Sequence, residues 1–199
     1  MLPIVVSMRV ETHEETAAQR DVMDRSWANF LSACGLTALY VPNNLRQAQQ
    51  MVASGLLKRL LLTDGNALIK CEGDAPERDQ VERFLLNTAL QARLPVMGVG
   101  RGMQVLQDHW DVALQKLEKH VMTRQIIQVD GQTEMVNSQH HWGATDSVAE
   151  LPVWAKATDG VVKGIRHDRL PVMGLMWHPQ RQDPYHQRDI RLFRKLFHD

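Results

Sequence analysis

The stretch Pro95-Val96-Met97-Gly98-Val99-Gly100-Arg101-Gly102-Met103-Gln104 decides the fold. An apolar run typical of a buried strand ends in glycines at three alternate positions, and a segment typical of a helix follows. This order predicts a sharp strand-to-helix turn that lifts one side chain above a parallel sheet. A Ser or Cys is expected at the apex of such a turn, but the apex residue is Gly100.

Strand-like and helix-like segments alternate through the first half of the chain. The predicted strands are 3–7, 36–41, 59–63 and 95–99, and the predicted helices are 19–34, 45–54, 77–92 and 101–110. Alternation at this spacing implies right-handed βαβ units and a mostly parallel sheet.

The second half has a different pattern, with two hairpins. Asp130-Gly131 and Asp159-Gly160 each stand between strand-like segments, which are 124–129 with 133–137 and 153–158 with 161–166. A strand at 171–176 and a helix at 184–198 follow. These segments predict an antiparallel addition to the parallel core, within a single α/β domain covering 1–199.

Composition limits the classes of function. The 199 residues carry 23 Lys and Arg against 23 Asp and Glu, so the formal net charge is zero. We therefore expect no nucleic-acid partner and no membrane-surface partner. The apolar runs are too short to span a membrane, and the first residues resemble a strand rather than a signal peptide. Cys34 and Cys71 lack metal-ligand spacing, and we expect two free thiols in a cytoplasmic protein.

His178 is the candidate base for the predicted turn. It follows an apolar strand and precedes Pro179, so it should lie at the carboxyl end of a parallel strand, where the turn also lies. A nucleophile needs such a base beside it and a third group to orient the base. A phosphate-binding loop is the alternative for the glycines, but G-x-G-x-G is incomplete for that motif and comes at the fourth strand.

In these motifs the chain resembles class I glutamine amidotransferases, and within them the γ-glutamyl hydrolase branch called peptidase C26. The segment 95–104 is similar to the family motif P-[VI]-x-G-[VI]-C-R-G-x-Q. Further similar segments are 62–66 (L-T-G-G-N in the family), Arg78-Asp79 with Glu82 (R-D-x-x-E), 136–141 (V-N-S-x-H-H) and 174–179 (G-x-x-W-H-P). The resemblance implies a flavodoxin-like three-layer α/β sandwich and hydrolysis of γ-glutamyl amides, with no metal and no organic cofactor.

The resemblance also implies roles for individual positions. The nucleophilic Cys of the family corresponds to Gly100, its base to His178 and its orienting Glu to Gln180. The backbone N–H groups of Gly65 and Arg101 correspond to the oxyanion hole. The implied substrate-binding residues are Asn66, Gln104, Ser138, Gln139 and His140.

Five positions depart from the family pattern, and they cluster at the implied active site. Besides Gly100 and Gln180, Asp64 replaces a loop glycine, Ala67 replaces a loop Asp and Lys163 replaces a strand Glu. Loss of a triad nucleophile costs on the order of 10⁶ in kcat. The sequence therefore favours a naturally degenerate family member that keeps a pocket for a γ-glutamyl or related small molecule.

Two alternatives stay open. The chain could be a γ-glutamyl amide hydrolase trapped by a Cys-to-Gly substitution, acting for example on nucleotide-linked glutamine in surface-polysaccharide biosynthesis. It could also be a regulatory or structural subunit of a synthase, or a homo-oligomer.

Arginines near predicted strand ends could receive a phosphate or carboxylate; they are Arg101, Arg124, Arg166, Arg169 and Arg181.

Overall fold

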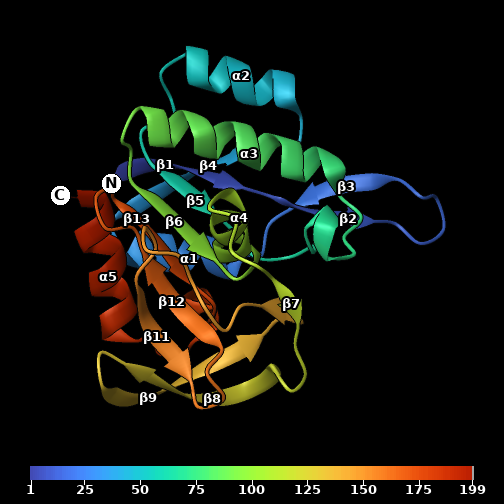
Figure 1. Ribbon diagram of the computed structural model, residues 1–199. Coiled ribbons are helices and arrows are strands. Elements are labelled where there is room, and N and C mark those ends of the chain that lie inside the picture. Colours follow the sequence, from blue (N-terminus) through green and yellow to red (C-terminus); the bar gives the residue numbers. More distant parts are fainter. Residues whose placement is uncertain (199) are drawn as a thin grey trace.

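A nine-stranded sheet forms the centre of the computed structural model, which describes residues 1–198 (Figure 1). Asp199, included in the predicted domain, and the side chain of Thr123 lie outside the described part. The strand order is β4-β1-β5-β6-β13-β12-β11-β8-β9. In chain order these strands are β1 (Leu2–Ser7), β4 (Leu36–Val41), β5 (Leu60–Leu62), β6 (Val96–Val99), β8 (Val121–Val129), β9 (Gln132–Gln139), β11 (Val153–Ala157), β12 (Val162–Arg166) and β13 (Val172–Leu175).

The sheet divides into the two halves that the sequence predicts. The five strands from β4 to β13 pair in parallel, and the pairings from β13 to β9 are antiparallel. The carboxyl ends of β1, β5, β6 and β13 consequently meet at one edge of the sheet.

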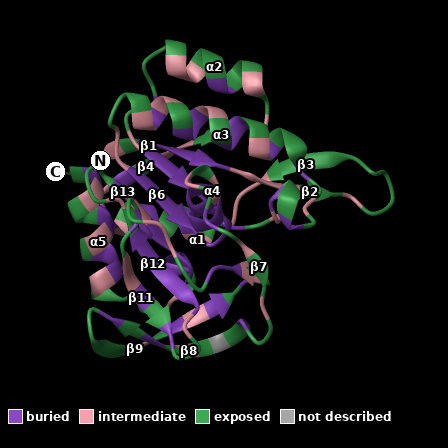
Figure 2. Ribbon diagram, viewed as in Figure 1, coloured by how far each residue is buried: buried purple, intermediate pink, exposed green. Residues whose placement is uncertain are grey.

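Helices cover both faces of the parallel half (Figures 1 and 2). One layer contains α2 (Leu45–Ala53), α3 (Pro76–Gln91) and α4 (Arg101–His109), and the other contains α1 (Ser26–Ala33) and α5 (Gln187–His198). Alternate residues of β1 face the two layers, since Val5 packs in the core with α2, α3 and α4 while Ile4 and Val6 pack in the core with α1 and α5. The predicted three-layer sandwich with antiparallel additions is confirmed.

The predicted helix 19–34 is wrong in its first part. Residues Gln19–Val22 form β3, which pairs with β2 (Arg9–Thr12) in an antiparallel hairpin that projects from the body (Figure 1). The helix α1 begins only at Ser26. Trp27, Phe30 and Leu31 supply the apolar stripe that predicted the helix, and all three are buried on α1.

The remaining elements are short. β7 (Gln115–Lys116) pairs with β10 (Trp142–Gly143), and 3₁₀ turns cover Ile69–Cys71 and Pro179–Arg181. The longest helix is α3 with 16 residues, and no helix within residues 1–198 has the length and hydrophobicity needed to cross a membrane. Cys34 and Cys71 are both free and buried.

Candidate functional site

Gly100 is the apex of a tight turn between β6 and α4. Its backbone angles are φ 56° and ψ −114°, in a region that L side chains rarely adopt. Its N–H donates to the carbonyl of Leu175 on β13 at 2.8 Å. Two residues on, a Cβ at Gly102 would lie 2.0 Å from the carbonyl oxygen of Leu62, so the first turn of α4 packs against β5 only because that residue is glycine.

His178 lies beside this apex, as the sequence predicts. A Cβ built on Gly100 would lie 3.1 Å from Nε2 of His178 and 3.1 Å from Cβ of Asp64. The backbone of His178 is held on both sides by the side chain of Asn137, which accepts from its N–H at 2.7 Å and donates to its carbonyl at 2.8 Å. The geometry of a nucleophile beside a base is therefore present, without the nucleophile.

The carboxylate of Asp64 lies at the place where a group on Gly100 would meet His178. Oδ2 of Asp64 is 3.3 Å from Nε2 of His178 and 2.7 Å from Nη2 of Arg181. Its Oδ1 accepts from the indole N–H of Trp27 at 3.3 Å. Burial alone would raise the pKa of Asp64, but His178, Arg181 and Trp27 together hold it well below its usual value. Asp64 is thus an anion fixed within the site.

The third position of the predicted triad makes no hydrogen bond to the base among the described residues. Gln180 is buried, but neither atom of its amide has a hydrogen-bond partner among the described residues. Nδ1 of His178 is likewise buried without a partner within residues 1–198. In a working relay the third group would accept a hydrogen bond from this nitrogen and fix the ring tautomer. Gln180 does not do so.

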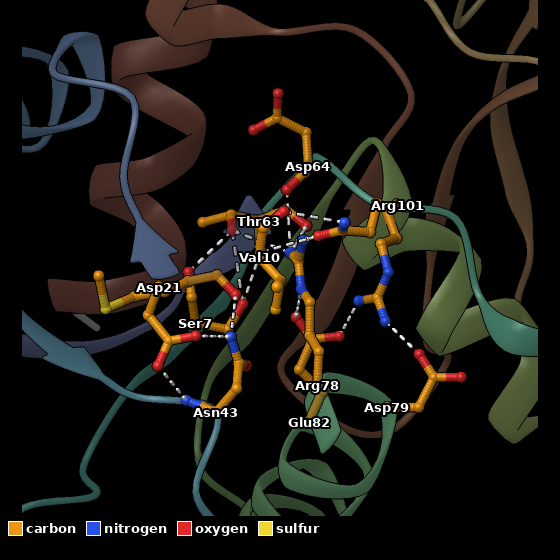
Figure 3. A network of polar contacts seen from close by, with 12 residues as sticks. Ser7, Val10, Asp21, Asn43, Thr63, Asp64, Arg78, Asp79, Glu82 and Arg101 are labelled. Atoms are coloured by element: carbon orange, nitrogen blue, oxygen red, sulfur yellow. Dashed lines mark hydrogen bonds and ion pairs between the residues drawn. The ribbon is translucent and has the colours of Figure 1, made fainter. Parts of the chain in front are cut away.

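A buried network of charges ties α3 to the turn (Figure 3). Glu82, fully buried, pairs with Nε of Arg78 at 3.0 Å and also with Arg101. Arg101 additionally pairs with Asp79. Burial would raise the pKa of Glu82, but the two guanidinium groups hold it below its usual value. Arg101 is therefore fixed by its side chain at the start of α4.

Arg78 also fixes the loop that follows β5. Its Nη2 donates to the carbonyls of Thr63 and Asp64, both at 2.9 Å (Figure 3). Asn66 in this loop accepts from the N–H of Val10 at 2.8 Å and donates to the carbonyl of Val10 at 3.0 Å. The amide of Asn66 is thus used to hold the loop, and Asn66 does not line the cavity described next.

A cavity of about 250 Å³ opens between the turn, the loop and His178. Of the predicted site residues it is lined by Gly65, Arg101, Gln104, Gln139, His140 and His178. Gln104 donates to the carbonyl of Trp142 at 2.8 Å, which fixes its amide at the wall. Gly100, Gln180 and Ser138 are not among the residues that line this cavity.

Behind the cavity wall lies a buried amine. Nζ of Lys163 is 2.6 Å from Nε2 of His140, 3.1 Å from Nδ1 of His120 and 3.1 Å from Oγ of Ser138. The other ring nitrogens can donate to the carbonyl of Trp142 and to Asp159, so all three neighbours can accept from an ammonium. Burial lowers the pKa of Lys163 to about 7. The burial of His140 and the nearby charge of Lys163 lower the pKa of His140 to about 2, so this ring is neutral.

The role of Arg181 went unrecognised in the sequence, where it was only one of several arginines near strand ends. Its guanidinium contacts Asp64, donates to Gln139 at 2.5 Å and donates to Asp24 at 3.1 Å. The available clue was its position three residues after His178. Among residues 1–198, no three His, Cys, Asp or Glu side chains converge to hold a metal ion.

This fold and site define a class I glutamine amidotransferase-like protein. A family model described as Peptidase C26 matches residues 2–126 and 113–180, so the chain belongs to the peptidase C26 family. Over 98% of its length it superposes on a protein of Thermoplasma acidophilum described as part of a GMP synthase, covering 94% of that chain with TM-score 0.73 and 18% identity. PurLQS from Thermotoga maritima is similar over 98% of this chain and 96% of that chain, with TM-score 0.66 and 16% identity.

Curated relatives carry hydrolase and synthase names. The chain is 22% identical to γ-glutamyl-CDP-amidate hydrolase of Campylobacter jejuni over 64% of each protein. It is 26% identical to γ-glutamyl-γ-aminobutyrate hydrolase of Escherichia coli O157:H7, over 63% of this chain and 60% of that protein. The carbamoyl phosphate synthase small chain of Pyrobaculum aerophilum is 25% identical over 74% of this chain and 44% of that protein. The matches thus span 44% to 64% of these relatives.

Proposed function

We propose that this chain is a peptidase C26 family member without thiol-dependent hydrolysis that keeps a pocket for a γ-glutamyl group or a related small molecule. The observation that carries the proposal is the carboxylate of Asp64 beside His178, at a turn whose apex, Gly100, has no side chain. An anion at this place opposes the negative charge that develops on a substrate carbonyl during nucleophilic attack.

The rest of the site supports the same proposal. A covalent route needs a nucleophile, a base and a group that orients the base. Gly100 supplies no nucleophile, and Gln180 makes no hydrogen bond to His178. The cavity remains open, and its wall residue Gln104 is fixed by a hydrogen bond. The backbone N–H groups of Gly65 and Arg101 are the proposed donors to a bound carbonyl.

Restoring the missing groups tests the proposal. The unmodified chain and Gly100→Cys are expected to release no glutamate above background from γ-glutamyl amides, including γ-glutamyl-γ-aminobutyrate and γ-glutamyl-CDP-amidate. The triple variant with Gly100→Cys, Asp64→Gly and Gln180→Glu is expected to exceed Gly100→Cys by roughly 10²-fold or more, because the base is then oriented and the anion removed. Adding His178→Ala to the triple variant is the control and should return the rate to background.

One outcome would favour a trapped hydrolase instead. Strong glutamate release by Gly100→Cys alone would mean that the site needs only its thiol, so Asp64 and Gln180 would not be marks of degeneration. The names of the two hydrolase relatives make this the main alternative.

A role as part of a synthase is the second candidate. It is supported by the resemblance to a carbamoyl phosphate synthase small chain and by exposed apolar side chains on β8 and β9, of which Ile126 is 47% and Met135 is 54% exposed. Affinity purification of the tagged chain should then recover a synthase in fixed stoichiometry, and Ile126→Asp with Met135→Asp should abolish recovery. A chain recovered alone under these conditions would speak against it.

A further inference from the structure

A second cavity of about 480 Å³ adjoins the first at Arg181. It is lined by Val121 and Met122 from β8, by Asn137, Ser138 and Gln139 from β9, and by His178 and Arg181. Because Asn137 is held by two hydrogen bonds to the backbone of His178, this part of the lining is fixed.

The two cavities share three lining residues, Gln139, His178 and Arg181. The guanidinium of Arg181 donates to Oδ2 of Asp64, which lines the first cavity, and to Oε1 of Gln139, which lines both. The side chain of Arg181 is 27% exposed and spans the boundary. The two cavities are therefore adjacent parts of one surface depression, with Arg181 between them and His178 lining both.

The two parts differ in chemistry. The first is lined mainly by amides, imidazoles and charged groups. The second includes two exposed apolar side chains of β8, since Val121 is 53% and Met122 is 38% exposed. An extended ligand with its polar head in the first part and an apolar group against Val121 and Met122 would bury both side chains, which water now contacts.

We propose that this second part binds the amine-side substituent of the ligand, and that the substituent is apolar. This inference rests on the proposed function, because it takes the first cavity as the γ-glutamyl pocket. The γ-carbonyl then lies near Gly100 and His178, and the group on the amide nitrogen extends past Arg181 over β8. The ligand class is a γ-glutamyl amide of an alkyl or aryl amine.

Calorimetric titration of the unmodified chain tests the inference. The ligand series is L-glutamine, then its γ-N-methyl, γ-N-butyl and γ-N-hexyl amides. Binding affinity is expected to rise by roughly two- to fourfold for each added methylene until the groove is filled. In the double variant Val121→Thr with Met122→Gln, which alters only exposed side chains, most of this rise should be lost. Met135→Gln is the matched control, because it is an exposed methionine of the same hairpin outside the groove, and it should keep the full rise.

The outcomes separate the two proposals. The apolar groove is overturned if glutamine binds but affinity does not rise along the series, or if affinity rises equally in the double variant. Either result leaves the γ-glutamyl pocket standing. Failure of every member of the series to bind overturns both. A preference for amides that end in a carboxylate or ammonium would assign the groove to a charged substituent and would also overturn the inference.

Discussion

At the scale of single residues, the glycine at position 100 has a measurable conformational role. Gly100→Ala should lower the free energy of unfolding, because the φ of 56° disfavours a Cβ and that Cβ would crowd Asp64 and His178. Gly160→Ala is the control, since Gly160 also has a positive φ, 87°, but nothing lies within 4 Å of its Cβ position. Urea denaturation should show a loss larger than that of Gly160→Ala by about 1 kcal/mol or more. Equal losses would mean that the site has room for a side chain.

The buried amine of Lys163 predicts how the free energy of unfolding depends on pH. Its pKa is lowered to about 7, below the value of an exposed lysine, so the unfolded chain binds more protons between about pH 7 and 10. Stability contributed at Lys163 should therefore rise as pH increases through this range. Lys163→Met should flatten that rise in urea denaturation measured at several pH values. Lys156→Met, on an exposed lysine of β11, is the control and should leave the rise unchanged.

The residue scale is also where sequence prediction succeeded and failed most plainly. Gly100 and His178 could be brought together from sequence, because both follow apolar strands and the ends of parallel strands meet. The contact between Asp64 and Arg181 could not, because the two residues are 117 positions apart and neither belongs to a periodic pattern. The missing hydrogen bond between Gln180 and His178 depends on side-chain orientation, which no local pattern encodes.

At the scale of elements, the spacing of apolar residues along the sequence determined which strands and helices could be predicted. Most of the parallel strands are apolar and bounded by turns, so these strands and most of the helices between them could be predicted from sequence. The hairpin of β2 and β3 could not be predicted in this way, because its residues are mostly polar and exposed. They also adjoin the apolar stripe of α1, which predicted a longer helix. Its strands pair only with each other, so no buried face marks them.

The helix α3 holds the site through Glu82, and this contact can be tested by its effect on stability. Glu82→Gln should cost about 3–5 kcal/mol, because Arg78 and Arg101 are buried and would lose their shared carboxylate. Glu77→Gln, at an exposed position of the same helix, should cost less than about 0.5 kcal/mol. Urea denaturation measures both. A loss near 1 kcal/mol for Glu82→Gln would mean that Asp79 and water replace the missing charge.

At the scale of the whole molecule, the ion pairs around Arg181 join distant parts of the chain. Arg181 contacts Asp24 next to α1, Asp64 after β5 and Gln139 at the end of β9. Elements from the parallel core and from the antiparallel addition are thus connected at the mouth of one cleft. The anion at the centre of this arrangement is Asp64, which makes the stability of the folded chain sensitive to acid.

The pKa of Asp64 is held below its usual value in the folded state, so its stabilising contribution is present above about pH 4 and is lost as pH falls. Asp64→Asn should therefore be less stable than the unmodified chain at pH 7, and the difference in unfolding free energy should shrink progressively as pH falls from about 4 to 2. Glu15→Gln removes one exposed carboxylate and should show no such convergence. Urea denaturation at pH values from 7 to 2 measures the difference. A difference that stays constant over this range would mean that Asp64 stabilises the fold by packing and hydrogen bonding to Trp27 rather than by its charge beside His178 and Arg181.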